Sequence, residues 1–197
     1  MQEKGEVKKL LLHSCCAPCS SYVLEYLSPF FEIEDFYYNP NITQKSEYEE
    51  RKAELKRLIA EQPHLHPVTF TEGKYDPETF AEITKGMEDL KEGGERCFKC
   101  YELRLREAAK IAREHGADFF GTTLTISPLK NADKLNEIGL KLADEYGVSY
   151  LTSDFKKKNG YLRSIQLSKD YSLYRQDYCG CAFSKAERER QKRESQI

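Results

Sequence analysis

The sequence contains no apolar run that approaches the roughly 20 residues of a membrane-spanning helix. Its N-terminal residues 1–9 are polar and charged, and the short apolar run that follows does not show the order of regions of a secretory signal peptide. Internal repeats, low-complexity tracts and linkers are also absent from it. We therefore expect a single cytoplasmic domain over residues 1–197, with no association with membranes.

The chain also lacks an excess of charge of one sign. Its 31 lysines and arginines almost balance 33 aspartates and glutamates, so the formal net charge is −2. This balance excludes an overall basic field of the kind that attracts nucleic acids, so any such contact must depend on a local basic patch. Apolar residues make up 39% of the chain, which predicts a folded globular protein rather than a disordered one.

Short apolar runs alternate with amphipathic segments along the chain. Five runs predict strands, at residues 8–13, 33–38, 67–70, 117–123 and 148–152. Helices are predicted at residues 20–27, 46–61, 100–115 and 131–146, from residue 76, and from residue 164 with a break at 179–181. Ser46 is the expected N-cap of the second helix, and Gly116 and Gly147 are the expected ends of two others.

This alternation predicts an α/β fold with parallel strands. We expect a three-layer, Rossmann-like sheet of about five strands, with helices on both faces and a helical C-terminal region. Residues 185–197 are expected to form a charged C-terminal helix or tail.

Seven cysteines are the most informative residues of the chain. They form three groups, which are Cys15, Cys16 and Cys19, then Cys97 and Cys100, then Cys179 and Cys181. An odd number in a cytosolic protein argues against a disulfide framework and for metal binding or thiol chemistry. The first group follows the first predicted strand, where parallel α/β sheets bind ligands and where a helix N-terminus favours thiolates.

Thiolates select zinc, copper(I) or iron–sulfur clusters. A structural zinc site would use only part of the cysteines and leave the others as core residues. A four-iron cluster held by cysteines, with further thiolates for a second metal or for substrate, would use all seven. A thioredoxin-like dithiol is disfavoured because Cys-Cys-x-x-Cys follows the first strand. The cysteines therefore favour an iron–sulfur enzyme, with structural zinc as the alternative.

Five blocks of the sequence, taken in order, form a recognisable pattern. They are Leu12–Ser20, Phe36–Ile42, Glu95–Leu105, Asp154–Tyr161 and Leu173–Cys181. Together they resemble the cobalamin-independent epoxyqueuosine reductases, the QueH family, from residue 10 to residue 184. The resemblance implies an oxidoreductase that converts epoxyqueuosine to queuosine at the wobble position of tRNA, the last step of queuosine biosynthesis. It also implies a 4Fe-4S cluster and an adjacent iron ion, without cobalamin.

With this resemblance, the cysteines divide into two sets. Cys97, Cys100, Cys179 and Cys181 are expected to hold the four-iron cluster, since two short-spaced pairs on separate segments can supply its four corners. The other set, Cys15, Cys16 and Cys19, is expected to line the substrate side, and at least two of these cysteines would bind the second iron. Cys15 and Cys16 are therefore also candidate catalytic residues.

Several other candidates lie in loops after predicted strands. Asn39 and Asn41 flank Pro40 and are either substrate contacts or ordinary turn residues. Asp154 is a candidate catalytic proton donor or metal ligand, or else a solvated loop residue. His13 adjoins the first cysteines and either belongs to the site or supports the strand end.

Basic and aromatic residues supply further candidates for substrate binding. The loop residues Lys156, Lys157 and Lys158 are the expected phosphate contacts, although charge runs are usually solvated. One of several tyrosines could stack on the modified base or donate a proton. These are Tyr37, Tyr38, Tyr101, Tyr161, Tyr174 and Tyr178.

The expected partners are a tRNA that carries epoxyqueuosine and an unidentified electron donor such as a ferredoxin or flavodoxin. Two other functions compete with this one. A sulfonucleotide reductase or sulfur-transfer enzyme would need a glycine-rich phosphate loop where this chain has Cys-Cys-Ala-Pro-Cys. A zinc-stabilised tRNA-binding module without catalysis would be colourless, whereas a four-iron protein is brown.

Overall fold

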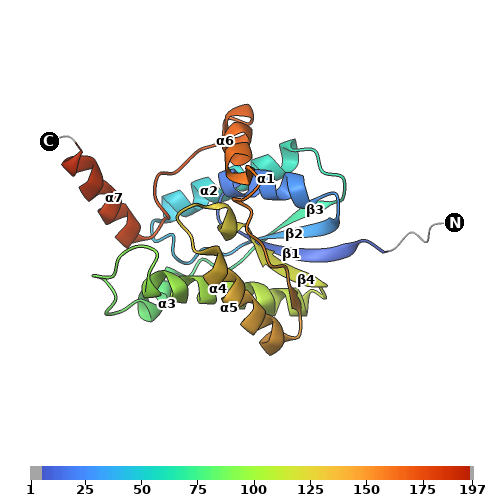
Figure 1. Cartoon of the computed structure of the whole chain (residues 1–197), viewed down its shortest axis with the longest axis horizontal. Helices are drawn as coiled ribbons and strands as arrows, with labels where there is room; N and C mark the ends of the chain where they lie inside the picture. The colour runs from blue at the N-terminus through green and yellow to red at the C-terminus, as the bar shows by residue number, and fades with distance from the viewer. Residues whose placement is uncertain (1–5, 196–197) are drawn as a thin grey trace.

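The computed structural model describes residues 6–195 and is built around one parallel sheet (Figure 1). The strands are β1 (Lys8–Ser14), β2 (Phe31–Tyr37), β3 (Val68–Glu72), β4 (Phe119–Thr122) and β5 (Ser149–Tyr150). Their order is β3-β2-β1-β4-β5, and every neighbouring pair is parallel. The strand order reverses between β1 and β4, so the ends of these two strands border the crevice in which such sheets bind ligands.

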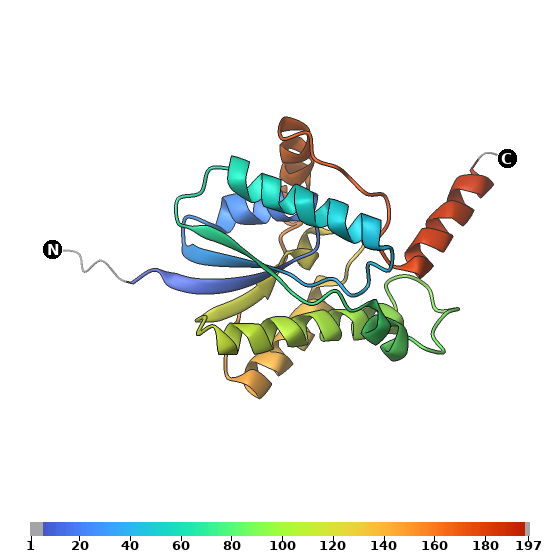
Figure 2. The same cartoon turned by 180° about the vertical axis from the view of Figure 1, so that it is seen from behind.

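Helices cover both faces of the sheet, which confirms the predicted α/β architecture (Figures 1 and 2). One layer contains α1 (Ala17–Leu27), α2 (Lys45–Glu61) and α6 (Gly160–Asp170). The other contains α3 (Pro77–Ile83), α4 (Glu95–Glu114) and α5 (Ala132–Tyr146), while the 3-10 turn η1 (Thr123–Ile126) follows β4. The last helix, α7 (Ala182–Glu194), projects from the side of the molecule toward which β1 runs.

The core lies on both sides of β1. Leu10 and Leu12 pack against α1, whereas Leu11 packs against α4, and all three side chains are fully buried. A strand buried on both faces is the expected centre of a parallel sheet.

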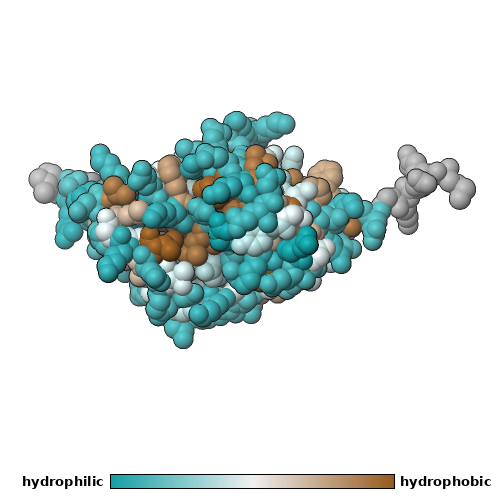
Figure 3. All heavy atoms as spheres, turned by 90° about the horizontal axis from the view of Figure 1, so that it is seen from below, coloured by the Kyte–Doolittle hydropathy of each residue, from teal (hydrophilic) through white to brown (hydrophobic). Residues whose placement is uncertain are grey.

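Figure 3 shows a largely hydrophilic outer face with smaller hydrophobic areas among the polar residues. Among residues 6–195, no helix has both the length and the apolar character needed to cross a membrane.

Some predicted helix boundaries are wrong. Helix α2 begins at Lys45 with Gln44 at its N-cap, so Ser46 is not the cap. The approach to this helix is held by a hydrogen bond from the Thr43 N–H to the Gly180 carbonyl (3.4 Å). Helix α4 begins at Glu95 rather than residue 100, so it contains both cysteines of the second group.

The C-terminal region also departs from its prediction. It forms two helices separated by the non-helical residues 171–181, a longer break than the predicted 179–181. The break packs against α2, because Arg57 donates to the Tyr171 carbonyl (3.0 Å) and Glu54 accepts from the Tyr174 N–H (2.9 Å). The charged terminal helix begins at Ala182 rather than residue 185. Residues 1–5 and 196–197, which the predicted domain and tail include, lie outside the described part of the chain.

Candidate metal and active site

The first cysteine group occupies the turn between β1 and α1. Cys16 is the N-cap of α1, and Cys19 lies in the first turn of that helix. The three sulfur atoms of Cys15, Cys16 and Cys19 lie within 4.8 Å of one another, and the Cys15 and Cys16 sulfurs are 3.6 Å apart. Such a compact set of soft donors at the positive end of a helix can bind a metal ion.

The electrostatics of this turn favour one thiolate. Hydrogen bonds from the thiols of Cys16 and Cys19, and then the charges of Arg104 and Lys130, hold the pKa of Cys15 well below its usual value. The same hydrogen bond to Cys15 raises the pKa of Cys16 to about 12, and the pKa of Cys19 is raised well above its usual value. Cys15 is therefore the cysteine of this group that ionises most readily.

The second and third groups lie close together. Cys97 and Cys100 lie near the start of α4, and Cys100 packs with Cys181 and Phe80 in a small buried cluster. Burial, with the charges of Cys179, Cys181 and Cys97, raises the pKa of Cys100 to about 12. These four sulfurs therefore interact electrostatically, and a bound cation would relieve their repulsion.

A buried ion pair on α2 holds the loop of the third group. Arg51 donates to the carbonyl of Cys179 (3.1 Å), to that of Tyr178 (3.4 Å) and to the Glu47 carboxylate (2.7 Å). Its guanidinium also lies over the Tyr178 ring, 5.3 Å from the ring centre. Gly180 has a φ of +114°, a conformation that favours glycine, so the loop closes against Arg51 without a side chain in the way.

A second buried arginine supports the first group. Arg104, on α4, donates to the side-chain oxygen of Asn39 (2.6 Å), and the Asn39 amide donates to the carbonyl of Ser14 (2.9 Å). Asn39 is fully buried, so in this conformation it offers no exposed atom to a substrate. Asn41 is also buried and donates to the carbonyl of Cys179 (3.5 Å). Both asparagines position cysteine loops, and their substrate contacts stay predictions.

His13 is fully buried behind the cysteines, and both of its ring nitrogens have hydrogen-bond partners. Nδ1 of His13 lies 3.0 Å from the Thr122 hydroxyl, which accepts from the Leu124 N–H. Nε2 of His13 lies 2.9 Å from the Tyr38 carbonyl and accepts from Nε of Arg104 (3.3 Å) in the same buried cluster. Burial and then the charge of Arg104 lower the pKa of His13 to about 3. His13 therefore supports the strand end as an uncharged residue.

A cavity of about 650 Å³ opens beside these groups. Three cysteines line it, Cys15, Cys19 and Cys179. Its positively charged lining residues are Arg51, Arg104, Lys130, Arg175 and Arg188, whereas its negatively charged ones are Glu92, Asp177 and Glu187. Ile126, Pro128, Leu129, Tyr161 and Tyr178 add apolar and aromatic surface. The cavity thus combines thiols, excess positive charge and flat apolar surfaces, which suits an anionic substrate with an aromatic base.

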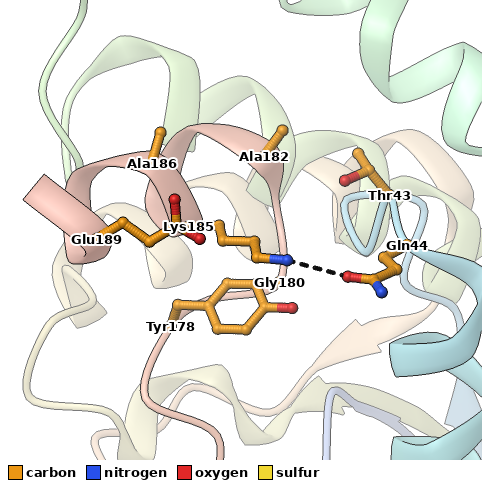
Figure 4. Close-up of a pocket in the computed structure, with 8 residues that line it drawn as sticks. All are labelled: Thr43, Gln44, Tyr178, Gly180, Ala182, Lys185, Ala186 and Glu189. Carbon is orange, nitrogen blue, oxygen red and sulfur yellow. Dashed lines mark hydrogen bonds between the residues drawn. The ribbon is translucent and has the colours of Figure 1, made fainter.

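A second hollow lies on the outer side of the same loop, between α7 and the residues before α2 (Figure 4). Its volume is about 480 Å³, and its lining includes Tyr178 and Gly180. Across it, the ammonium of Lys185 donates to the side-chain oxygen of Gln44 (3.2 Å), which ties the start of α7 to the approach to α2. Its lining contains no cysteine among the described residues, so the larger cavity is the candidate site.

The loop after β5 lies apart from the lining of the larger cavity. Among the described residues that line it, neither Asp154 nor Lys156, Lys157 and Lys158 is present. Burial raises the pKa of Asp154, but ion pairs with Lys156 (2.7 Å) and Lys157 (3.2 Å) bring it below its usual value. A carboxylate that stays ionised is a poor proton donor. The predicted roles of this loop therefore stay predictions.

Sequence reasoning did not single out three charged residues of the site. Arg51, Arg104 and Lys130 all lie near cysteine loops, and Lys130 donates to the sulfur of Cys179 (3.4 Å). Burial lowers the pKa of Lys130, but the charges of Cys179, Tyr101 and Cys15 together outweigh it and raise this pKa above its usual value. Only Arg104 falls within a block that carried the family resemblance, so it alone had a usable signal in the sequence.

Comparisons with known proteins show the family of this chain. The family model "Epoxyqueuosine reductase QueH" matches residues 10–187. A protein of that name from Staphylococcus epidermidis is 45% identical over 187 residues, which cover 93% of this chain and 79% of the relative. Its counterpart from Staphylococcus aureus is 46% identical over 89% of this chain and 75% of the relative. Another, from Thermotoga maritima, is 36% identical over 91% of both chains. The chain therefore belongs to the QueH family of epoxyqueuosine reductases.

Proposed function

We propose that this chain is an oxidoreductase that reduces epoxyqueuosine to queuosine at the wobble position of tRNA, the last step of queuosine biosynthesis. One observation carries the proposal: in a chain of this family, a compact group of three cysteines lies at the switch point of the sheet and borders a cavity with excess positive charge. The test is anaerobic conversion of tRNA that contains epoxyqueuosine, followed by mass spectrometry of the nucleosides.

The residues present fit a four-iron cluster and a second iron. We assign the cluster to Cys97, Cys100, Cys179 and Cys181, which repel one another as thiolates and would share their charge with bound iron. The second iron is assigned to the first group, Cys15, Cys16 and Cys19, of which at least two would be ligands. When bound, these groups supply electrons and a Lewis acid for the epoxide oxygen.

The protein's own residues prepare the site for this chemistry. Removal of the epoxide oxygen as water consumes two electrons and two protons and leaves a carbon–carbon double bond. Arg104 and Arg51 keep the cysteine loops in place. The apolar residues Ile126, Pro128 and Leu129 line the cavity and give the modified base a surface to lie on. Tyr161 lines the cavity and has a phenol proton to give, whereas Asp154 is paired with lysines outside it. We therefore favour Tyr161 over Asp154 as the proton donor.

The tRNA would contact basic residues of the loop after β5 and of the larger cavity. Lys156, Lys157 and Lys158 remain our proposed phosphate contacts, and Lys158 has no ion-pair partner among the described residues. Arg175 and Arg188 line the cavity itself and are exposed, so they are placed to meet phosphates next to the modified nucleotide. We further propose that the chain acts as one domain in the cytoplasm and receives electrons from an unidentified donor such as a ferredoxin or flavodoxin.

A further inference from the structure

Lys130 lies on a short, well-braced turn between η1 and α5. The Lys130 N–H donates to the Ser127 carbonyl (3.2 Å), and the Ser127 hydroxyl accepts from the Leu129 N–H (3.3 Å). The next residue, Asn131, caps α5 by accepting from the Lys134 N–H (2.9 Å). This turn follows β4, so it faces the turn that follows β1 across the switch point of the sheet. The side chain of Lys130 therefore starts from a fixed point beside the cysteines.

The charge partner of this lysine is sulfur. Its ammonium donates to the Cys179 sulfur over 3.4 Å, and its side chain lines the cavity with Cys15 and Arg104. Within residues 6–195, no carboxylate oxygen lies within 4.0 Å of this ammonium. Arg104, in contrast, is already engaged by Asn39. The charge partner of Lys130 is therefore Cys179, one of the four cysteines that we assign to the cluster.

We propose that Lys130 sets the reduction potential of the iron–sulfur site. The inference rests on the proposed function, because it takes Cys179 as a cluster ligand. Reduction adds negative charge to a cluster and its thiolates. A positive charge and an N–H donor on a ligand sulfur stabilise the reduced state more than the oxidised state, and so raise the potential. Lys130 is a positioning and tuning residue in this account, since it acts through Cys179 rather than on the substrate.

The test is an anaerobic redox titration of the reconstituted protein, followed by visible absorption and electron paramagnetic resonance. Lys130→Met removes the charge and the donor at nearly constant length. It is expected to lower the reduced-to-oxidised ratio at a fixed potential about tenfold, which is about 59 mV for one electron. Lys130→Arg keeps the charge and is expected to titrate close to the wild type. The matched control is Lys141→Met on α5, where an exposed lysine lies 3.8 Å from Glu102, away from the cavity lining.

An unchanged potential in Lys130→Met at full iron content would overturn the inference, even if turnover fell, because the lysine would then act on the substrate. An equal shift in Lys141→Met would also overturn it, since the effect would belong to net charge alone. If Lys130→Met takes up no cluster, Lys130→Gln decides, because it removes the charge but keeps a neutral N–H donor for Cys179. Its potential is expected to lie below that of the wild type, by less than the loss of both charge and donor would give, and a wild-type potential would overturn the inference. A wild-type protein that binds no iron would instead refute the proposed function.

Discussion

Gly180→Ala should loosen the third cysteine group without touching a sulfur atom. An added Cβ would lie 2.8 Å from Cγ1 of Ile42 and 3.2 Å from Nη1 of Arg51, and both of these side chains are buried. The φ of +114° costs about 1–3 kcal/mol for a residue with a side chain. Overpacking adds about 1–3 kcal/mol, so the native loop should lose at least about 2 kcal/mol. Since each 1.4 kcal/mol of free energy changes a binding constant tenfold, the iron affinity should fall at least roughly 30-fold.

The assay is the rate at which a chelator removes iron from the anaerobically reconstituted protein, together with urea unfolding of the metal-free protein. Gly86→Ala is the matched control, because Gly86 also has a positive φ (+77°) but has no atom within 4 Å of an added Cβ. It should lose about 1 kcal/mol of unfolding free energy and keep its iron. The reasoning fails if Gly180→Ala retains iron as firmly as the wild type and unfolds at the same urea concentration.

Three further predictions test the site. Cys97→Ala should abolish the four-iron absorption spectrum, whereas Cys15→Ala should keep the spectrum and lose turnover; the opposite pattern would reverse the assignment of the two cysteine sets. Reversal of charge at residues 156–158 should weaken tRNA binding and flatten its salt dependence by about one unit of slope for each phosphate that the loop no longer neutralises. Unchanged affinity and slope would move the RNA contacts elsewhere, for example to Arg175 and Arg188. Tyr161→Phe should lower kcat by about 10²–10⁴-fold with little change in KM; a wild-type rate would exclude this phenol as the proton donor.

Local patterns were sufficient to predict the sheet. Each strand and most helices are encoded by apolar periodicity and by nearby residues such as Gly147, which ends α5 in the left-handed conformation as expected. The three cysteine groups were also visible, since their spacing is local. The predicted N-cap Ser46 was wrong: α2 begins at Lys45, directly after a segment whose Thr43 N–H donates to the distant Gly180 carbonyl, a contact that no local pattern records.

The cations around the cysteines could not be predicted for the same reason. Arg51 reaches the Cys179 carbonyl across 128 residues of sequence, and Lys130 reaches the Cys179 sulfur across 49. An Asn-Pro-Asn turn is recognisable from the sequence, but the direction of its side chains is not. Asn39 points inward to Arg104 rather than toward the cavity, because a buried arginine needs an acceptor there.

The most direct measurement of the central proposal uses the iron-reconstituted protein, tRNA that contains epoxyqueuosine, and dithionite, without oxygen. After digestion, mass spectrometry of the nucleosides should show epoxyqueuosine replaced by a product lighter by one oxygen atom, and the protein should be brown before the reaction. A protein that carries its full iron content yet leaves epoxyqueuosine unchanged would contradict the account, as would a colourless zinc protein with the same fold.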